Sequence, residues 1–264
     1  MLLLSWNIAG RTGARQQAQF RALNTRDWEV LCLQEVTPTN VAGWRGFLEG
    51  AGLHVAVSEW PELPRGSRRF AVLIAAIAPL EPLPPLPLPW PERHLAVRSE
   101  LDGTEVEIHT LHSPLSQKPD RVKVRTLETV FGELADVNGV PRVIAGDFNT
   151  PRYESREGEI FTFARTRTGA IRRGYGERHD RAELALVGEL PRRGWRDAFR
   201  HLHGYERRDR SWMAPPGYGW RLDHVIASAE LEPVACDYVH DWRDQGLSDH
   251  SAVWAELRPV SSGR

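Results

Sequence analysis

The feature that most constrains the fold is a short apolar run, Val143 to Ala145, which glycine, two polar residues and proline follow. The run predicts a buried strand, and Pro151 stops further strand pairing. If the extended conformation continues past Gly146, Asp147 and Asn149 point the same way, because side chains alternate along a strand. A carboxylate and a carboxamide are then presented together at a sheet edge. A turn in which both side chains bond nearby backbone is the competing interpretation.

Apolar runs of this kind recur along the chain, and several end in a polar residue. We expect strands at 2–5, 29–34, 53–58, 70–77, 95–100, 106–111, 143–145, 222–227, 231–238 and 251–257. Helical periodicity predicts helices at 14–25, 39–50, 120–137, 182–190 and 195–202. Together these elements favour one domain with both parallel and antiparallel strands.

Prolines and glycines mark the connections between these elements. Asp102-Gly103 predicts a hairpin between the strands on either side of it. The proline-rich segment 79–91 can be neither a helix nor a central strand. Residues 207–219, which contain Pro215-Pro216-Gly217, are expected to form a loop.

The charge of the chain is unevenly distributed. The net charge is −1, and only Lys118 and Lys123 among the 34 basic residues are lysines. From Arg152 to Arg221 there are 16 arginines and 10 acidic residues, which gives this segment a net charge of +6. Either a solvated arginine face or a rim that faces phosphates explains the segment.

Other features of the sequence indicate the class of protein. Cys32 and Cys236 are the only cysteines, so we expect no disulfide framework and a reducing compartment. The first residues lack the pattern of a signal peptide, and no apolar run approaches the roughly 20 residues of a membrane span. We therefore expect a soluble, cytoplasmic protein, and the sequence predicts no protein partner.

Six strand ends carry the residue types that metal-assisted phosphoester hydrolysis requires. They are Asn7, Glu35, His112, Asp147 with Asn149, Asp223, and Asp249 with His250. Each alone could be a helix cap, a surface acid, a core histidine or a turn residue. Together they supply cation ligands, a group that accepts a proton from water and a donor to the leaving oxygen. The sequence has no Walker-type phosphate loop and no cysteine–histidine cluster with zinc spacing.

The motifs around these residues resemble those of the endonuclease/exonuclease/phosphatase family, which includes deoxyribonuclease I. They are Ser5-Trp6-Asn7, Leu33-Gln34-Glu35, Leu111-His112-Ser113, Gly146-Asp147-Phe148-Asn149, Leu222-Asp223-His224 and Leu247-Ser248-Asp249-His250. The combination of Gly-Asp-Phe-Asn with Ser-Asp-His is specific. The resemblance implies an α/β four-layer sandwich, with two packed mixed sheets flanked by helices, and a single catalytic domain at residues 1–260.

The resemblance also implies a divalent-metal site. Glu35 would be the principal ligand of Mg²⁺ or Mn²⁺, with Asn7 beside it. Asp249 would reach a second metal position.

The remaining motif residues would carry the chemistry. Asp147 and His250 would handle the attacking water, and Asp223 would orient the imidazole of His250. Asn149 would hold a phosphate oxygen or the water, and His112 would donate to the phosphate or the leaving oxygen.

The support of His112 departs from the deoxyribonuclease I pattern. In that branch an acidic residue near the strand that corresponds to residues 70–77 supports the histidine, whereas here Arg68 and Arg69 are the neighbours. A backbone carbonyl is one alternative. In the exonuclease III branch a tyrosine tends to occupy the place of His112.

The substrate is expected to be set by the arginine-rich segment and the aromatic residues that follow it. The expected substrate-binding residues are Arg165, Arg167, Arg172 and Arg173, near phosphates, and Trp212 and Trp220, stacked on bases. A nuclease or phosphodiesterase acting on DNA or RNA is the preferred interpretation. A phosphatase or phosphodiesterase for small-molecule or lipid-headgroup phosphoesters is the alternative. An inactive binding protein on the same scaffold is a third possibility, against which the complete set of residues argues.

Overall fold

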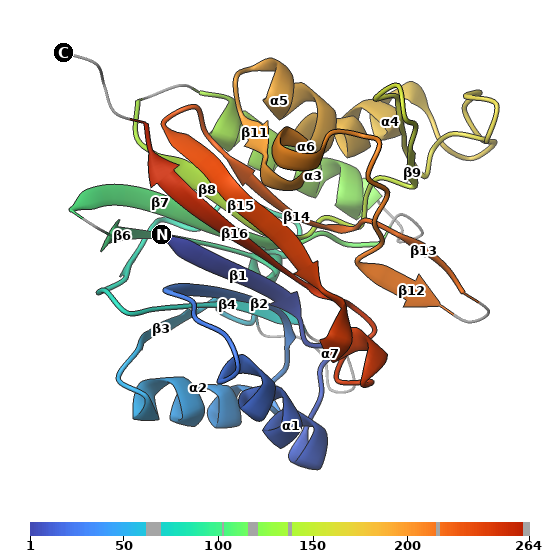
Figure 1. Ribbon diagram of the computed structural model, residues 1–264. Helices are drawn as coiled ribbons and strands as arrows, with labels where there is room; N and C mark the ends of the chain where they lie inside the picture. The colour runs from blue at the N-terminus through green and yellow to red at the C-terminus, as the bar shows by residue number, and fades with distance from the viewer. Residues whose placement is uncertain (62–69, 102, 116–120, 137–138, 215–216, 261–264) are drawn as a thin grey trace.

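Two six-stranded mixed sheets pack face to face, and helices cover their outer faces, as the computed structural model shows (Figure 1). The structure describes residues 1–61, 70–101, 103–115, 121–136, 139–214 and 217–260. The arrangement confirms the four-layer α/β sandwich that the motifs imply. Within these residues no helix is both long and apolar enough to cross a membrane.

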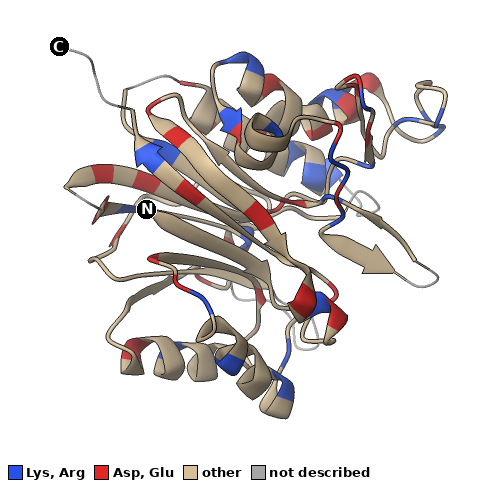
Figure 2. Cartoon of the chain, viewed as in Figure 1, with Lys and Arg blue, Asp and Glu red and all other residues tan. Residues whose placement is uncertain are grey.

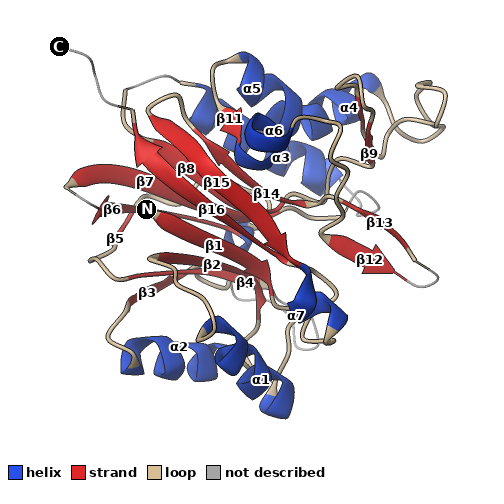
Figure 3. Cartoon of the chain, viewed as in Figure 1, coloured by secondary structure: helices blue, strands red, loops and turns tan. Residues whose placement is uncertain are grey.

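The first sheet combines strands from both halves of the chain. In spatial order they are β15 (Leu231–Val239), β16 (Ala252–Pro259), β1 (Leu2–Asn7), β2 (Val30–Val36), β4 (Ala71–Ala76) and β3 (His54–Val57). β1 and β2 are parallel, and the other neighbours are antiparallel. Helices α1 (Gly13–Leu23) and α2 (Val41–Gly50) cover its outer face, and α7 (His240–Asp244) joins β15 to β16 (Figure 3).

The second sheet, like the first, has six strands and one parallel pair. In spatial order its strands are β11 (Arg196–Asp197), β14 (Asp223–Ala227), β8 (Arg142–Asp147), β7 (Thr104–His112), β6 (His94–Leu101) and β5 (Glu81–Pro82). β7 and β8 are parallel, and the rest are antiparallel. Its outer face is covered by α3 (Val122–Ala135), α4 (Glu177–Leu184), a π-helical turn (Ala185–Glu189) and α5 (Leu190–Arg192), while α6 (Ala198–His203) packs on β14 and β15.

The main core lies between the sheets, with a smaller core under each helical layer. Leu3 and Ile74 of the first sheet share the central core with Ile108 and Val143 of the second. Leu4, next to Leu3, faces α1 and α2 instead. Because both faces of each central strand are covered, the strands have nearly continuous apolar sequences rather than alternating ones.

Two predictions of local structure were wrong. Residues 207–219 are not all loop: β12 (Trp212–Ala214) and β13 (Tyr218–Trp220) form a hairpin, and Pro215 and Pro216, which indicated a loop, lie outside the described residues. The helix expected at 195–202 begins only at Ala198, because Arg196 and Asp197 pair with β14 and Asp197 then caps the helix. In the proline-rich segment, β5 is an edge strand, as the exclusion of a central strand allows.

Candidate active site

The two parallel pairs place four of the predicted residues at one end of the molecule. Asn7 ends β1 and Glu35 lies near the end of β2, whereas His112 and Asp147 end β7 and β8. Parallel strands run in the same direction, so each pair of residues shares one sheet edge. The two edges meet where Nδ2 of Asn7 donates a hydrogen bond of 3.0 Å to Oδ2 of Asp147.

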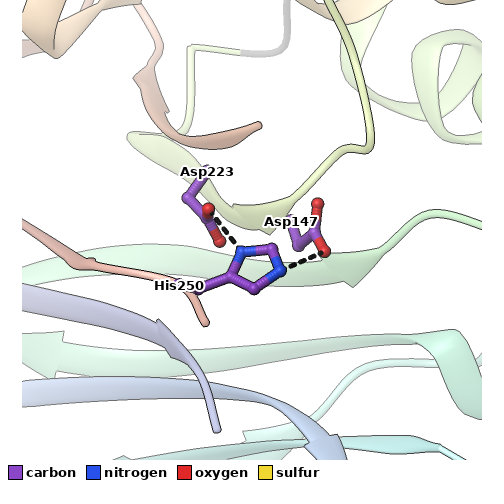
Figure 4. Close-up of side chains that lie close together, drawn as sticks. All are labelled: Asp147, Asp223 and His250. Carbon is purple, nitrogen blue, oxygen red and sulfur yellow. Dashed lines mark hydrogen bonds and ion pairs between the residues drawn. The ribbon is translucent and has the colours of Figure 1, made fainter. Parts of the chain in front are cut away.

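A histidine between two carboxylates lies at this junction. Asp223 opens β14, opposite Asp147 in the ladder. Its Oδ2 lies 2.8 Å from Nδ1 of His250, and Nε2 of His250 lies 3.8 Å from Oδ2 of Asp147. Figure 4 shows the imidazole between the two carboxylates, and all three residues are buried. The hydrogen bond to Asp223 fixes the orientation of the ring and keeps a proton on Nδ1.

Burial and neighbouring charges shift the proton affinities of these groups. Burial raises the pKa of Asp147 above its usual range, and the charge of Asp223 adds to this rise against the opposing effect of His250. Burial alone would lower the pKa of His250, but the negative charges of Asp223 and Asp147 raise it above its usual value. The site therefore joins a carboxylate of increased basicity to an imidazole that retains its proton, as acid–base chemistry requires.

Two of the predicted residues adopt a backbone conformation that is unusual for side chains other than glycine. Glu35 has φ of 60° and Asn149 has φ of 52°. The pairing of β2 with β4 shifts register between Leu33 and Val36, so Glu35 lies in a bulge. Such bulges redirect a side chain next to active sites, and strained backbone of this kind concentrates at functional positions.

The turn after β8 depends on Gly146. Its φ is 146°, and a Cβ atom there would lie 2.1 Å from the carbonyl oxygen of Leu111. Past this glycine, Oδ1 of Asp147 accepts a hydrogen bond of 2.9 Å from the backbone N–H of Asn149, and Nδ2 of Asn149 donates to the carbonyl of Ser113 at 2.8 Å. The turn interpretation is therefore the correct one for the backbone, because β8 ends at Asp147 and Asn149 is not extended. The turn uses Oδ1 of Asp147 and leaves its Oδ2 facing Asn7 and His250.

Arg93 contacts His112, although the sequence analysis did not identify it. Its guanidinium Nη1 donates a hydrogen bond of 2.7 Å to Nδ1 of His112. The same Nη1 lies 3.3 Å from Nε2 of His112, so the shorter contact makes Nδ1 the acceptor. Since a guanidinium only donates, the proton of a neutral imidazole is then on Nε2, which lies 3.8 Å from Oε1 of Glu35 and 3.9 Å from Oδ2 of Asp147.

A signal for Arg93 was present in the sequence. The hairpin pairs Leu101 with Thr104 and His94 with Leu111, so the next antiparallel pair, one residue before His94 and one after Leu111, sets Arg93 against His112. Arg68 and Arg69, named above as neighbours of His112, lie outside the described residues.

Lys123 is a second residue that the sequence analysis did not assign to the site. Its ammonium is buried and donates to the backbone carbonyl of Asn149 and to Oε1 of Glu183, each at 2.6 Å. Burial lowers the pKa of Lys123, while the charge of Glu183 acts in the opposite direction. Lys123 thus holds the backbone of Asn149 in place from the direction of α3.

The charges at the junction suit a divalent cation. Ligand atoms of Asp147, Asp223 and His250 lie within 4.8 Å of one another. Oδ1 of Asp223 is buried and has no hydrogen-bond partner among the described residues, so this oxygen has room for a donor or a cation. Nδ2 of Asn7 also lies 3.4 Å from Oε1 of Glu35, while Oδ1 of Asn7 accepts from the N–H of Ala9. A ligand role for Asn7 therefore requires its carboxamide to turn over, whereas Glu35 already offers an oxygen.

The aromatic hairpin is attached to the site through its first strand. The rings of Trp212 and Trp220 stack at 4.9 Å with an angle of 1° between their planes. Trp212 forms a β-bridge with His250, and its indole N–H donates to Oδ2 of Asp249 at 3.0 Å. Asp249 is exposed, in contrast to its neighbour His250. The structure therefore brings both tryptophans and Asp249 to the rim of the site.

The four arginines expected near phosphates have different surroundings. Asp180 binds the guanidinium of Arg165 through two hydrogen bonds of 2.8 and 2.5 Å. Arg172 donates to the carbonyl of Phe163, and Arg173 is exposed. Arg167 is exposed and lines a cavity. Arg165 is thus held by a carboxylate, whereas the other three are not ion-paired within the described part of the chain.

Comparison with solved structures supports the fold assignment. The chain is 21% identical to an AP endonuclease from Archaeoglobus fulgidus, with a TM-score of 0.72 over 97% of this chain and 99% of that one. It is 18% identical to D. rerio TDP2 in complex with a single-strand DNA product, with a TM-score of 0.67 over 98% of each chain. It is also 18% identical to a variant of the 3′ phosphatase NExo from Neisseria bound to a product DNA hairpin, with a TM-score of 0.67 over 98% of this chain and 99% of that one.

Sequence comparison identifies the family directly. A search of curated proteins gave no match. The endonuclease/exonuclease/phosphatase family, in contrast, matches residues 4–250. This range contains every strand end that carries a predicted catalytic residue, and the fold agrees with it. The chain therefore belongs to the endonuclease/exonuclease/phosphatase family, and it is a phosphoesterase of that family.

Proposed function

We propose that this chain is a divalent-metal-dependent phosphodiesterase that cleaves nucleic acid, with water as the nucleophile. The observation that carries the proposal is the placement of His250 between Asp223, at 2.8 Å, and Asp147, at 3.8 Å. The basic carboxylate of Asp147, next to an imidazole that Asp223 keeps protonated, can accept the proton that an attacking water loses.

Each side chain of the site has a separate role in the hydrolysis. Asp147 receives the proton from water, and its contacts with Asn7 and Asn149 fix the oxygen that does so. Asp223 keeps Nε2 of His250 directed at the same place. His112, with its Nε2–H directed into the site, donates to the phosphate or the leaving oxygen.

The metal would be Mg²⁺ or Mn²⁺, because the available donors are carboxylate and amide oxygens. Glu35 would be its main ligand. Asn7 and Asp147 lie beside Glu35, and the exposed Asp249 lies nearer the rim of the site. When bound, such a cation neutralises the charge that develops on the phosphate.

Nucleic acid is the preferred substrate class because stacked tryptophans and an arginine-rich segment border the site. The stacked Trp212 and Trp220 adjoin His250, and aromatic faces of this kind bind bases. The strands β9, β12 and β13 of the arginine-rich segment lie at the end of the molecule where β1 and β2 finish, while α5 and α6 of the same segment cover the sheets away from that end (Figures 1 and 2). Structures similar to this chain include proteins bound to DNA products. A cytoplasmic location stays a prediction.

The test is an assay of purified protein on single- and double-stranded DNA and RNA, with Mg²⁺ or Mn²⁺ and with EDTA. We expect metal-dependent cleavage of at least one nucleic acid. Small phosphomonoesters and lipid-headgroup phosphoesters are assayed in parallel. Turnover of these compounds with no cleavage of any nucleic acid would overturn the choice of substrate, while leaving the phosphoesterase assignment intact.

A further inference from the structure

A cavity of about 550 Å³ lies in the arginine-rich segment, separate from the cluster of Asp147, Asp223 and His250. Its walls are formed by Arg152, Tyr153, Phe161, Thr166, Arg167 and Arg208. The volume is typical of cavities that bind small ligands. The lining combines three cations with two aromatic rings.

The cavity is built by short strands rather than by loose side chains. β9 (Tyr153–Glu154) pairs with β10 (Ile160–Phe161), so Tyr153 and Phe161 stand opposite each other with ring centroids 5.8 Å apart. A bridge between Arg165 and Ile171 closes a small hairpin that carries Thr166 and Arg167. Backbone pairing therefore fixes Tyr153 and Phe161, which form the aromatic floor of the cavity.

A buried ion-pair network anchors this floor to the active site. The carboxylate of Glu154, next to Tyr153, accepts hydrogen bonds from Arg200 and from Arg221, which immediately precedes Leu222 and Asp223. On the other side, Arg152 follows Asn149 by three residues, so their Cα atoms lie at most about 11 Å apart. A bound strand could therefore reach both the cavity and the candidate catalytic residues with neighbouring phosphate groups.

The three arginines of the cavity are available to an anion. Arg165, Arg200 and Arg221 of the same segment are paired with carboxylates. In contrast, no carboxylate of the described residues lies within the 4.0 Å ion-pair distance of Arg152, Arg167 or Arg208. Arg208 donates to the hydroxyl of Tyr153 at 2.9 Å, and Arg152 donates to the carbonyl of Arg165 at 2.8 Å. The charge of Arg208 contributes to the lowered pKa of Glu157, although the two side chains form no ion pair.

We propose that this cavity is a second phosphate-binding subsite, which takes a phosphate group of the substrate strand outside the scissile position. The guanidinium groups bind the phosphate oxygens, and Tyr153, of which 44% is exposed, offers a ring face to the attached sugar or base. This inference rests on the proposed function, because the strand that it binds is the one that the active site cleaves. The phosphate is either internal to the strand or at its end.

The test measures binding of labelled single-stranded oligonucleotides by fluorescence anisotropy, in EDTA so that no cleavage occurs. The variant is Arg167→Glu with Arg208→Glu. The control is Arg45→Glu with Arg258→Glu, which makes the same charge change outside the segment, at side chains that are 43% and 66% exposed. We expect the first variant to bind roughly tenfold more weakly and to lose about 0.7 from the salt slope, as the loss of one phosphate contact predicts. The control should bind like the wild type, and equal binding by both variants would overturn the subsite.

Two further arms sharpen this test. Tyr153→Leu removes the ring together with the hydroxyl that Arg208 contacts, whereas Tyr153→Phe removes the hydroxyl alone. We expect Tyr153→Leu to bind roughly fivefold more weakly than Tyr153→Phe; equal binding by these two variants would remove the ring from the proposal. Oligonucleotides with and without a 5′- or 3′-phosphate identify the source of the group. A loss of affinity confined to the phosphorylated strand assigns the cavity to a chain end, and an equal loss for all strands assigns it to an internal phosphate.

Failure of the subsite and failure of the proposed function give different results. If the wild type cleaves nucleic acid while the Arg167/Arg208 variant binds as the wild type does, the subsite is wrong and the function stands. Thymidine 3′,5′-bisphosphate serves as the probe for the opposite case, by calorimetry. If the wild type cleaves no nucleic acid but binds this compound through Arg167 and Arg208, the function fails and a phosphate site stands. If neither strand nor bisphosphate binds, the subsite is overturned.

Discussion

Asp223 and His250 share a hydrogen bond of 2.8 Å, and the other ring nitrogen of His250 faces Asp147. The bond fixes the ring and stabilises its protonated form, as the raised pKa of His250 indicates. We predict that Asp223→Asn lowers kcat by roughly 10²- to 10⁴-fold while the fold persists, because a neutral amide no longer stabilises the protonated ring. Steady-state kinetics on a cleaved phosphodiester, with circular dichroism as a check of folding, measures this.

A carboxylate–histidine pair on the surface supplies the control. Oε1 of Glu232 lies 2.9 Å from Nε2 of His201, and both side chains are more than a third exposed. Glu232→Gln should leave kcat unchanged. Equal rates for the Asp223 and Glu232 variants would show that the pair in the site has no part in turnover.

Gly146 admits no side chain. Its Cβ would lie 2.1 Å from the carbonyl oxygen of Leu111, within the pairing of β7 and β8. We predict that Gly146→Ala lowers the free energy of unfolding by about 2–4 kcal/mol, through the clash and the strained φ. Urea denaturation measures it. Gly132→Ala makes the same change in α3, where the Cβ meets nothing within 4 Å, and should stabilise by up to about 1 kcal/mol; a similar loss in both would exclude the clash.

Glu154 is enclosed by two guanidinium groups. Arg200 and Arg221 each bind it with contacts of 2.6 and 2.7 Å, and all three side chains are largely buried. Removal of one partner from a buried network leaves charges uncompensated, so we predict that Glu154→Gln costs roughly 3–5 kcal/mol.

The matched change is Glu128→Gln, which removes the partner of Arg178 from an exposed pair of 2.6 Å. We expect about 0–1 kcal/mol there. Thermal and urea unfolding compare the two variants, and equal small losses would mean that the network contributes no more than a surface pair.

A buried histidine pair predicts the response to acid. Nε2 of His94 lies 3.3 Å from Nδ1 of His109 between β6 and β7. Burial lowers the pKa of His94 from 6.5 to about 4, and burial, then His94 and Arg142, lower that of His109. The unfolded chain therefore binds protons that the folded chain does not, and stability falls as the pH drops from about 6.5 toward 4, by roughly 3 kcal/mol for His94.

Urea midpoints between pH 7 and pH 4 measure this loss. His94→Gln should reduce the dependence and leave the part that belongs to His109. His54→Gln, at an exposed position of β3, should leave it unchanged. A slope in His94→Gln equal to that of the wild type would place the acid sensitivity elsewhere.

Much of the site could be predicted because it lies at strand ends. Apolar runs indicated the central strands, and the polar residues that ended several of these runs belonged to the site, as Asn7 and Asp147 show. The contact between Arg93 and His112 was missed because it depends on which residues pair across a hairpin. The hairpin was predicted, but its residue pairs were not assigned. The hairpin of Trp212 and Trp220 was missed because Pro215-Pro216-Gly217 dominated a segment whose flanks pair. Lys123 acts through a backbone carbonyl, for which the sequence carries no local signal.

The central claim is that His250 takes part in metal-dependent hydrolysis of a phosphodiester. Single-turnover cleavage of labelled DNA by the wild type and by His250→Ala, each with Mg²⁺ and with EDTA, tests it most directly. We predict that EDTA abolishes wild-type cleavage and that His250→Ala, folded as judged by circular dichroism, loses roughly 10³-fold or more in rate with Mg²⁺. A folded His250→Ala variant that cleaves DNA at the wild-type rate would contradict the account.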